Sequence, residues 1–161
     1  MQISFNLPHV FVPQSSDVDN ALALRALLEC MVQLNLAYIE LHPTKPLYES
    51  GVRYGRTKIW EPIPALYERG VGDCKSLAAA LIAQYRAKGI PARPVFRFNP
   101  RGDGNKDFHI LVQTPKGWED PSKKLGMLDK DVNRFYVDTG GMVAHGEGVG
   151  LFSKIAHWFV T

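Results

Sequence analysis

The stretch that decides the fold is Gly70–Ala80, which reads GVGDCKSLAAA. A loop of glycines and Asp73 leads to Cys74, and an apolar, alanine-rich run follows. Asp73 is a favourable N-cap, and its carboxylate is expected to accept hydrogen bonds from the first turn of a helix. The helix is expected to end in AKGIPA, where Gly89 supplies a left-handed cap and Pro91 prevents continuation. This pattern places Cys74 in the first turn of a helix.

A cysteine at the start of a helix is a candidate nucleophile, because the helix dipole favours its thiolate form. The alternative is that Cys74 is a small buried core residue, the common role of a free cysteine. Cys30 has no histidine near it in the sequence and is interpreted as a packing residue. A chain with these two cysteines does not resemble a disulfide-stapled scaffold.

The composition is that of an ordinary globular domain, with 161 residues, of which 45% are hydrophobic and 22% are charged. We expect a single domain over residues 1–161, with its core at 52–138. The net charge of +3 and the lack of a basic run with interleaved aromatics argue against a nucleic-acid partner. No signal-peptide pattern and no apolar run of membrane-spanning length is visible, which predicts a cytoplasmic protein without a membrane span.

Periodicity predicts a long helix over about 17–41, opened by Ser16 and Asp19 at the spacing of a capping box. Residues 42–64 carry four prolines and are expected to be irregular but ordered, as functional loops often are. The apolar face of the helix comprises Leu24, Leu28, Met31, Val32, Asn35 and Ile39.

Strands are expected at 52–54, 92–98, 107–113 and 118–120, with the last three forming an antiparallel meander. Helices followed by such a meander indicate an α+β fold. Outside this core we expect an edge strand within 2–12, a strand at 135–137, a flexible glycine-rich segment at 140–150 and a helix at about 151–160.

Three residues form a candidate catalytic group, because a thiol nucleophile needs a base and the base needs an orienting acceptor. His109 lies in one expected strand and Asp120 at the end of the next. If these strands pair, both side chains can meet on one face, and the start of the helix can bring Cys74 to His109. Taken singly, His109 also fits an ordinary half-buried strand residue, and Asp120 a turn former.

The span from Trp60 to Pro121 resembles the transglutaminase-like superfamily, whose fold is related to that of papain-type thiol enzymes. The resemblance implies an α+β fold with a catalytic cysteine at the N-terminus of a helix packed on an antiparallel sheet. The matching blocks, in the family's order, are Gly72-Asp73-Cys74, Gly89-Ile90-Pro91-Ala92-Arg93, Phe108-His109-Ile110-Leu111-Val112 and Trp118-Glu119-Asp120-Pro121.

Within that superfamily the sequence is most similar to bacterial transglutaminase-like cysteine proteinases, which carry a tryptophan and a proline upstream of Gly-Asp-Cys, as Trp60 and Pro64 do here. In those proteins the cysteine is usually followed by Glu-Asp, and acidic residues can hold calcium. Here Lys75-Ser76 follow Cys74, which argues against a calcium requirement and places a cation beside the thiolate. No metal site and no cofactor is expected.

The resemblance implies that a Cys74 thiolate, paired with protonated His109, attacks an amide carbonyl while Asp120 orients the histidine. The backbone N–H of Cys74 and the indole of Trp60 would bind the oxyanion, and Asp73 is assigned to the same oxyanion and substrate-binding region. Simple core packing is the alternative role for Trp60. Hydrolysis would make the protein a protease or amidase, the preferred expectation, and transfer to a lysine would make it a transglutaminase.

Two other classes of function remain as alternatives. One is a non-catalytic scaffold in a larger assembly such as a phage particle, docked through the glycine-rich segment and C-terminal helix. The other is a zinc site made of Cys74, His109 and Asp120, which lacks the paired-ligand spacing of known zinc motifs. The expected partner of the enzyme is a protein or peptide substrate.

Overall fold

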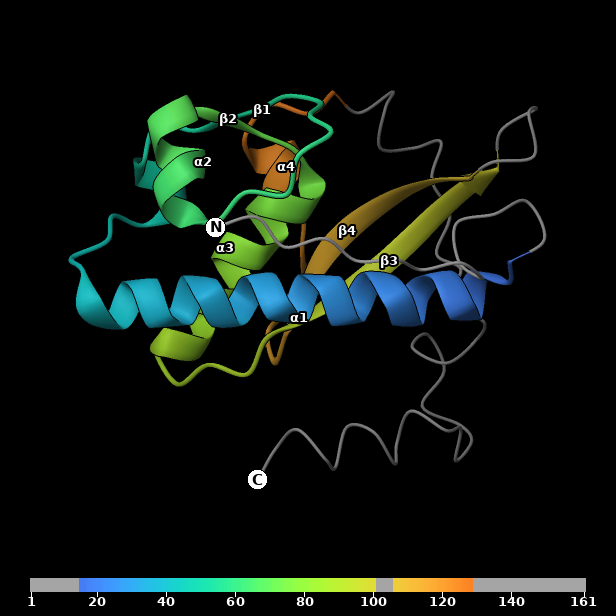
Figure 1. The fold of residues 1–161 in the computed structure, drawn as a ribbon, viewed down its shortest axis with the longest axis horizontal. Helices are drawn as coiled ribbons and strands as arrows, with labels where there is room; N and C mark the ends of the chain where they lie inside the picture. The colour runs from blue at the N-terminus through green and yellow to red at the C-terminus, as the bar shows by residue number, and fades with distance from the viewer. Residues whose placement is uncertain (1–14, 101–105, 129–161) are drawn as a thin grey trace.

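The computed structural model describes residues 15–100 and 106–128 (Figure 1). Within these ranges the chain forms an α+β fold, as the sequence predicts. The strands expected within 2–12 and at 135–137, the glycine-rich segment at 140–150 and the helix at 151–160 all lie outside the described residues.

The longest helix, α1, spans Asp17–Leu41 and begins at Ser16, whose Oγ accepts a hydrogen bond from the Asp19 N–H at 3.1 Å. Its buried face packs on α3, which spans Cys74–Ala87. Cys30 is exposed, so its interpretation as a packing residue is wrong. It lies two positions, or about 200° of helical rotation, beyond Leu28 and therefore on the outer side of α1. The buried face comprises Leu24, Leu28, Val32 and Asn35.

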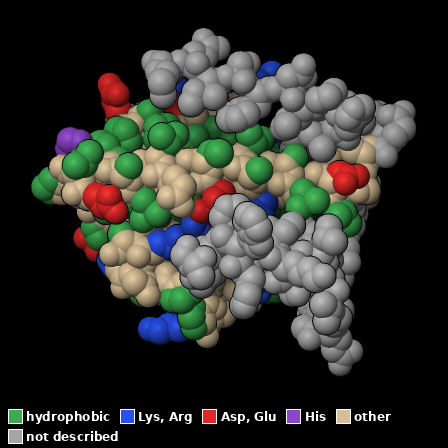
Figure 2. Space-filling view, turned by 60° about the horizontal axis from the view of Figure 1, so that its bottom comes forward, with side chains coloured by type: hydrophobic (Ala, Val, Ile, Leu, Met, Phe, Trp, Pro, Cys, Tyr) green, Lys and Arg blue, Asp and Glu red, His purple; other side chains and the backbone are tan. Residues whose placement is uncertain are grey.

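Helix α1 is also apolar on part of its outer surface, where Leu34 and Leu41 are exposed (Figure 2). By length and composition alone, Val18–Leu41 is the one described helix that could cross a membrane. Charged side chains at positions 25, 29 and 40 interrupt this apolar stretch, which is why no such run is evident in the sequence. In the fold described here its inner face packs on α3 as that of a core helix does.

Helix α2, Ile63–Arg69, begins within the region that was expected to be irregular. Its N-cap, Pro62, offers no side-chain acceptor, and the Ile63 N–H is instead bonded by Asn35 Oδ1 of α1 at 2.8 Å. Because the cap comes from another helix, it leaves no local signal in the sequence.

Gln84 of α3 makes two of the hydrogen bonds that hold the segment between α1 and α2. Gln84 Oε1 accepts from the Leu47 N–H at 2.9 Å, and its Nε2 donates to the Lys45 carbonyl at 2.9 Å. Leu47 opens a short 3₁₀ turn, η1, at Leu47–Glu49 and is itself buried in the core. The long proline-rich connection is therefore attached to the helix that begins with Cys74.

The end of α3 has the hydrogen bonds of a Schellman motif. Gly89 has a φ of +72°, its N–H donates to Arg86, and the Ile90 N–H donates to Tyr85. The predicted left-handed glycine cap is confirmed.

Two small sheets complete the described fold. Strand β1 (Arg53–Tyr54) runs parallel to β2 (Val71–Gly72). Strands β3 (Arg93–Pro100), β4 (Lys106–Thr114) and β5 (Gly117–Glu119) form an antiparallel sheet in that order. The register places Arg97 opposite His109 and Val112 opposite Glu119. A four-residue helix, α4 (Pro121–Lys124), follows β5 and contacts α3.

Gly72, two residues before Cys74, is required by packing. A Cβ at this position would lie 2.4 Å from Leu66 Cδ1 and 3.4 Å from Leu77 Cδ2, and both leucines are fully buried. We expect Gly72→Ala to lower the free energy of unfolding by about 1–3 kcal/mol, measured by urea denaturation. In a Leu66→Ala background the same change should cost much less, because the clashing atom is gone. Equal costs in both backgrounds would contradict this explanation.

Candidate active site

Cys74 is the first residue of α3. The small parallel sheet holds β2, the strand that leads into this helix. The Gly55 N–H donates to the Gly72 carbonyl at 2.9 Å, which ties β2 to the chain leaving β1. The Cys74 side chain is nearly enclosed, with 8% of its residue surface exposed. The predicted position of this cysteine at a helix N-terminus is confirmed.

The thiol of Cys74 lies against the backbone of β4. Its Sγ–H donates to the Phe108 carbonyl at 3.9 Å, and the Ile110 N–H also bonds to the sulfur. These two backbone groups belong to the residues on either side of His109. The structure therefore brings Cys74 to the point on β4 that carries His109.

His109 and Asp120 are in direct contact. His109 Nε2 lies 2.8 Å from Asp120 Oδ2, and the imidazole is almost fully buried. Because an ionised carboxylate only accepts hydrogen bonds, Nε2 carries the proton and Nδ1 is the basic nitrogen of the neutral ring. The pairing of β4 with β5 that was expected from the sequence produces this contact.

Asp120 also caps the short helix α4, because its Oδ1 accepts from the Lys123 N–H at 3.0 Å. Burial acts to raise the pKa of Asp120, but the hydrogen bond and charge of His109 and the N–H groups of α4 outweigh it. The net pKa is lowered, so Asp120 stays ionised against His109 at neutral pH.

The expectation of a lowered pKa at Cys74 is wrong. Burial first and the charge of Asp73 second raise the pKa of the thiol, to about 12, while Lys75 acts in the opposite direction. Lys75 has less influence than its position suggests because its charge is already paired with Asp73. The resting thiol is therefore neutral at pH 7.

Asp73 does not cap α3 through its side chain, which corrects that prediction. Its Oδ2 is bound instead by the ammonium of Lys75, and Lys75 Nζ also donates to the Thr57 carbonyl at 2.8 Å. Because the Lys75 ammonium binds the Asp73 carboxylate, that carboxylate does not accept a hydrogen bond from the N–H groups of the first turn of α3. Asp73 Oδ1 is buried and has no hydrogen-bond partner among the described residues.

Trp60 is half-buried and packs against the hydrophobic core. Next to it, the Glu61 N–H donates to Ser76 Oγ at 3.0 Å, so Trp60 lies beside the first turn of α3. Within the described residues its indole N–H makes no hydrogen bond. This position fits both roles considered for Trp60, core packing and donation to a bound substrate.

The arrangement of the site agrees with a comparison of protein families. Residues 44–119 match the model of the transglutaminase-like superfamily. This segment belongs to that superfamily. No curated protein and no solved structure shows a significant match to the chain. The transglutaminase-like segment contains Cys74 and His109 and ends one residue before Asp120.

The sequence did not single out Tyr54, a residue of β1 whose phenol responds to the charge of Cys74. Tyr54 pairs in register with Gly72. Burial raises the pKa of its phenol first, and the charge of Cys74 raises it next. The parallel pairing of β1 with β2 places Tyr54 opposite Gly72, so no local motif could have revealed this relation.

Two further features bear on what the site can hold. Among the described residues there is no cluster of three or more histidine, cysteine, aspartate or glutamate side chains suited to a metal ion. The zinc alternative therefore finds no support there. An open pocket of about 660 Å³ adjoins Asp120, but neither Cys74 nor His109 lines it.

Proposed function

We propose that the protein is a thiol-dependent hydrolase, a cysteine protease or amidase, in which Cys74, His109 and Asp120 form the catalytic triad. One observation carries this proposal: Cys74 is bonded to the backbone on both sides of His109, while His109 Nε2 is bonded to Asp120 at 2.8 Å. These contacts support the assignment of Cys74 as nucleophile, His109 as base and Asp120 as orienting acid. The superfamily of residues 44–119 supports cysteine-dependent acyl transfer or hydrolysis as the general chemistry.

In this mechanism His109 Nδ1 takes the proton of the Cys74 thiol as the sulfur attacks an amide carbonyl carbon. The neutral resting thiol makes this transfer part of the chemical step, and Asp120 stabilises the imidazolium that forms. His109 then gives its proton to the leaving nitrogen as the C–N bond breaks, which leaves a thioester. Water, deprotonated by His109, attacks the thioester and releases the acid.

The negative oxygen of the tetrahedral intermediate needs donors. The Cys74 backbone N–H points out of the first turn of α3 and is one candidate. The phenol of Tyr54 and the indole of Trp60 are candidates for the second donor. Since all of these groups belong to the chain itself, the proposed chemistry requires no cofactor, and the proposed substrate is a protein or peptide.

A second candidate function is transfer of the acyl group to an amine, and one observation favours it. Asp73, next in sequence to the proposed nucleophile, has a buried oxygen, Oδ1, to which no donor in the described part of the chain is bonded. Such an oxygen can accept a hydrogen bond from the N–H of an incoming neutral primary amine, whose lone pair attacks the thioester and displaces the Cys74 sulfur. The two functions share the thioester and differ only in the group that attacks it.

The test offers the full chain a glutamine-containing peptide mixture, with and without a fluorescent primary amine. The Cys30→Ser variant serves as the parent, because Cys30 is exposed. We expect peptide cleavage or ammonia release, both lost in Cys74→Ala and unchanged by EDTA. Fluorescent labelling in place of hydrolysis would favour the transglutaminase. Equal turnover by Cys74→Ala would contradict the proposal.

A further inference from the structure

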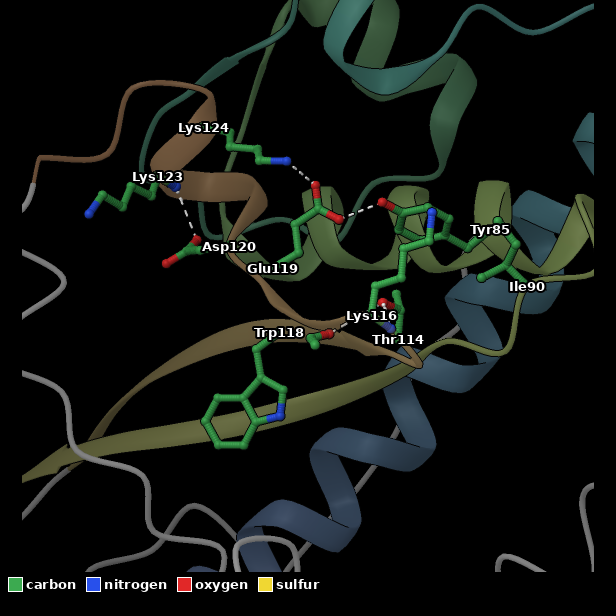
Figure 3. A pocket seen from close by; sticks show the side chains of 10 residues that line it. Tyr85, Ile90, Thr114, Lys116, Trp118, Glu119, Asp120, Lys123 and Lys124 are labelled. Carbon is green, nitrogen blue, oxygen red and sulfur yellow. Dashed lines mark hydrogen bonds and ion pairs between the residues drawn. The ribbon is translucent and has the colours of Figure 1, made fainter.

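Glu119 is the residue before Asp120, and donors from three different elements bind its carboxylate. Figure 3 shows two of these donors, Tyr85 and Lys124. Tyr48 of η1 donates to Oε1 at 2.7 Å, and Tyr85 of α3 donates to Oε2. Lys124 of α4 forms an ion pair with Oε1. We call Glu119, Tyr48, Tyr85 and Lys124 the Glu119 network.

At neutral pH the charges in the Glu119 network favour an ionised Glu119. Burial acts to raise the pKa of Glu119, but the hydrogen bonds from Lys124 and the two tyrosines outweigh it and lower the pKa. The hydrogen bond to Glu119 raises the pKa of Tyr85 to about 12, and burial raises that of Tyr48. Lys124 Nζ also lies 4.9 Å from the centre of the Tyr48 ring. An ionised carboxylate is thus held by neutral phenols and a cation.

The place of Glu119 in the chain gives this network a consequence for the site. Strand β5 ends at Glu119, which pairs with Val112 of β4, so the sheet no longer holds the next residue. That residue is Asp120, whose Oδ2 binds His109. Glu119 and Trp118 extend to opposite sides of β5, and Glu119 is the one turned toward α3 and α4 (Figure 3).

We propose that Glu119 is a positioning residue, which holds Asp120 against His109 by tying the end of β5 to η1, α3 and α4. Asp120 is then fixed from both directions, by the Glu119 network before it and by the N–H groups of α4 after it. Lys124 connects the two, because it belongs to α4 and binds Glu119. The effect of this positioning on catalysis rests on the proposed function, whereas its effect on the His109–Asp120 contact does not.

The test compares Glu119→Gln and Tyr85→Phe in the full chain carrying Cys30→Ser, with Asp120→Asn as the reference for a lost contact. Tyr67→Phe is the matched control, since in the described part of the chain the Tyr67 phenol is hydrogen-bonded to Lys45, Gln84 and Ser50 and to no member of the Glu119 network. The first readout is the low-field proton resonance of His109 Nε2–H and its exchange with solvent, measured by NMR. The second is the rate of Cys74 alkylation by iodoacetamide across pH.

We expect Glu119→Gln, and more weakly Tyr85→Phe, to move the His109 resonance upfield and speed its exchange, as Asp120→Asn does. Alkylation near neutral pH should slow by about tenfold in Glu119→Gln, and Tyr67→Phe should match the parent. A lowered melting temperature with an unchanged resonance would overturn the positioning role. A shifted resonance with alkylation that is indifferent to His109→Ala would leave positioning intact and count against the proposed function instead.

Discussion

Replacing Lys75 by methionine is expected to lower the free energy of unfolding by about 3–5 kcal/mol, because it strands a buried charge. Asp73 and Lys75 have 7% and 6% of their surfaces exposed, and the ammonium is the partner of Asp73 Oδ2. Within the described residues Asp73 Oδ1 already lacks a partner, so loss of the cation would leave both carboxylate oxygens without one there. Lys75 also bonds the Thr57 carbonyl, and that loop would lose its attachment. Urea denaturation at pH 7 measures the change.

Two control variants separate buried charge from lost packing. The double variant Asp73→Asn with Lys75→Met should recover much of the stability, because no unpaired charge remains. Glu29→Gln breaks the Glu29–Arg86 pair, whose side chains are 30% and 27% exposed, and should cost no more than about 1 kcal/mol. A cost for Lys75→Met as small as that of Glu29→Gln would contradict the assignment.

Replacing His109 by alanine is expected to reduce acylation of the protein by p-nitrophenyl acetate about 10²–10⁴-fold at pH 7. The physical reason is the neutral thiol: with a pKa near 12, Cys74 has very little thiolate at pH 7 and needs a base to take its proton. His42→Ala is the control, because His42 is exposed and its ring packs on Tyr38. Release of p-nitrophenol, followed by stopped flow, gives the rate.

The dependence of Cys74 alkylation on pH should change in the same variant. A raised pKa means that the thiolate fraction keeps increasing as pH rises toward about 12. In His109→Ala the rate should therefore rise about tenfold per pH unit from pH 7 upward. At pH 7 the parent should react faster than His109→Ala, because His109 can take the proton of the thiol. Identical profiles for the two proteins would show that His109 is not the base for Cys74.

The parts of this protein that could be predicted from its sequence are those encoded by local patterns. Apolar residues three and four apart define α1, and the Gly89 cap defines the end of α3. Alternation and turn residues predict β3, β4 and β5, and their pairing brings His109 to Asp120. The formation of these elements depends on residues close together in the chain, so the features can be predicted from the sequence.

What the sequence did not predict depends on contacts between distant segments. Helix α2 receives its cap from Asn35, and a parallel pairing places Tyr54 opposite Gly72, two residues before Cys74. The raised pKa of Cys74 follows from burial, which no motif reports. Asp73 has the residue type of an N-cap, but a lysine two positions on takes its carboxylate. In each case a tertiary contact outweighs the local preference.

The most direct test of the proposed triad is to locate the acyl group after brief reaction with p-nitrophenyl acetate. Intact and peptide mass spectrometry should find acetyl on Cys74, as a thioester that neutral hydroxylamine removes. The adduct should form in Cys30→Ser, be absent at this position in Cys74→Ala, and form far more slowly in His109→Ala and Asp120→Asn. Acetyl found only on lysines or Cys30, at a rate indifferent to His109, would contradict the assignment of Cys74 as the nucleophile.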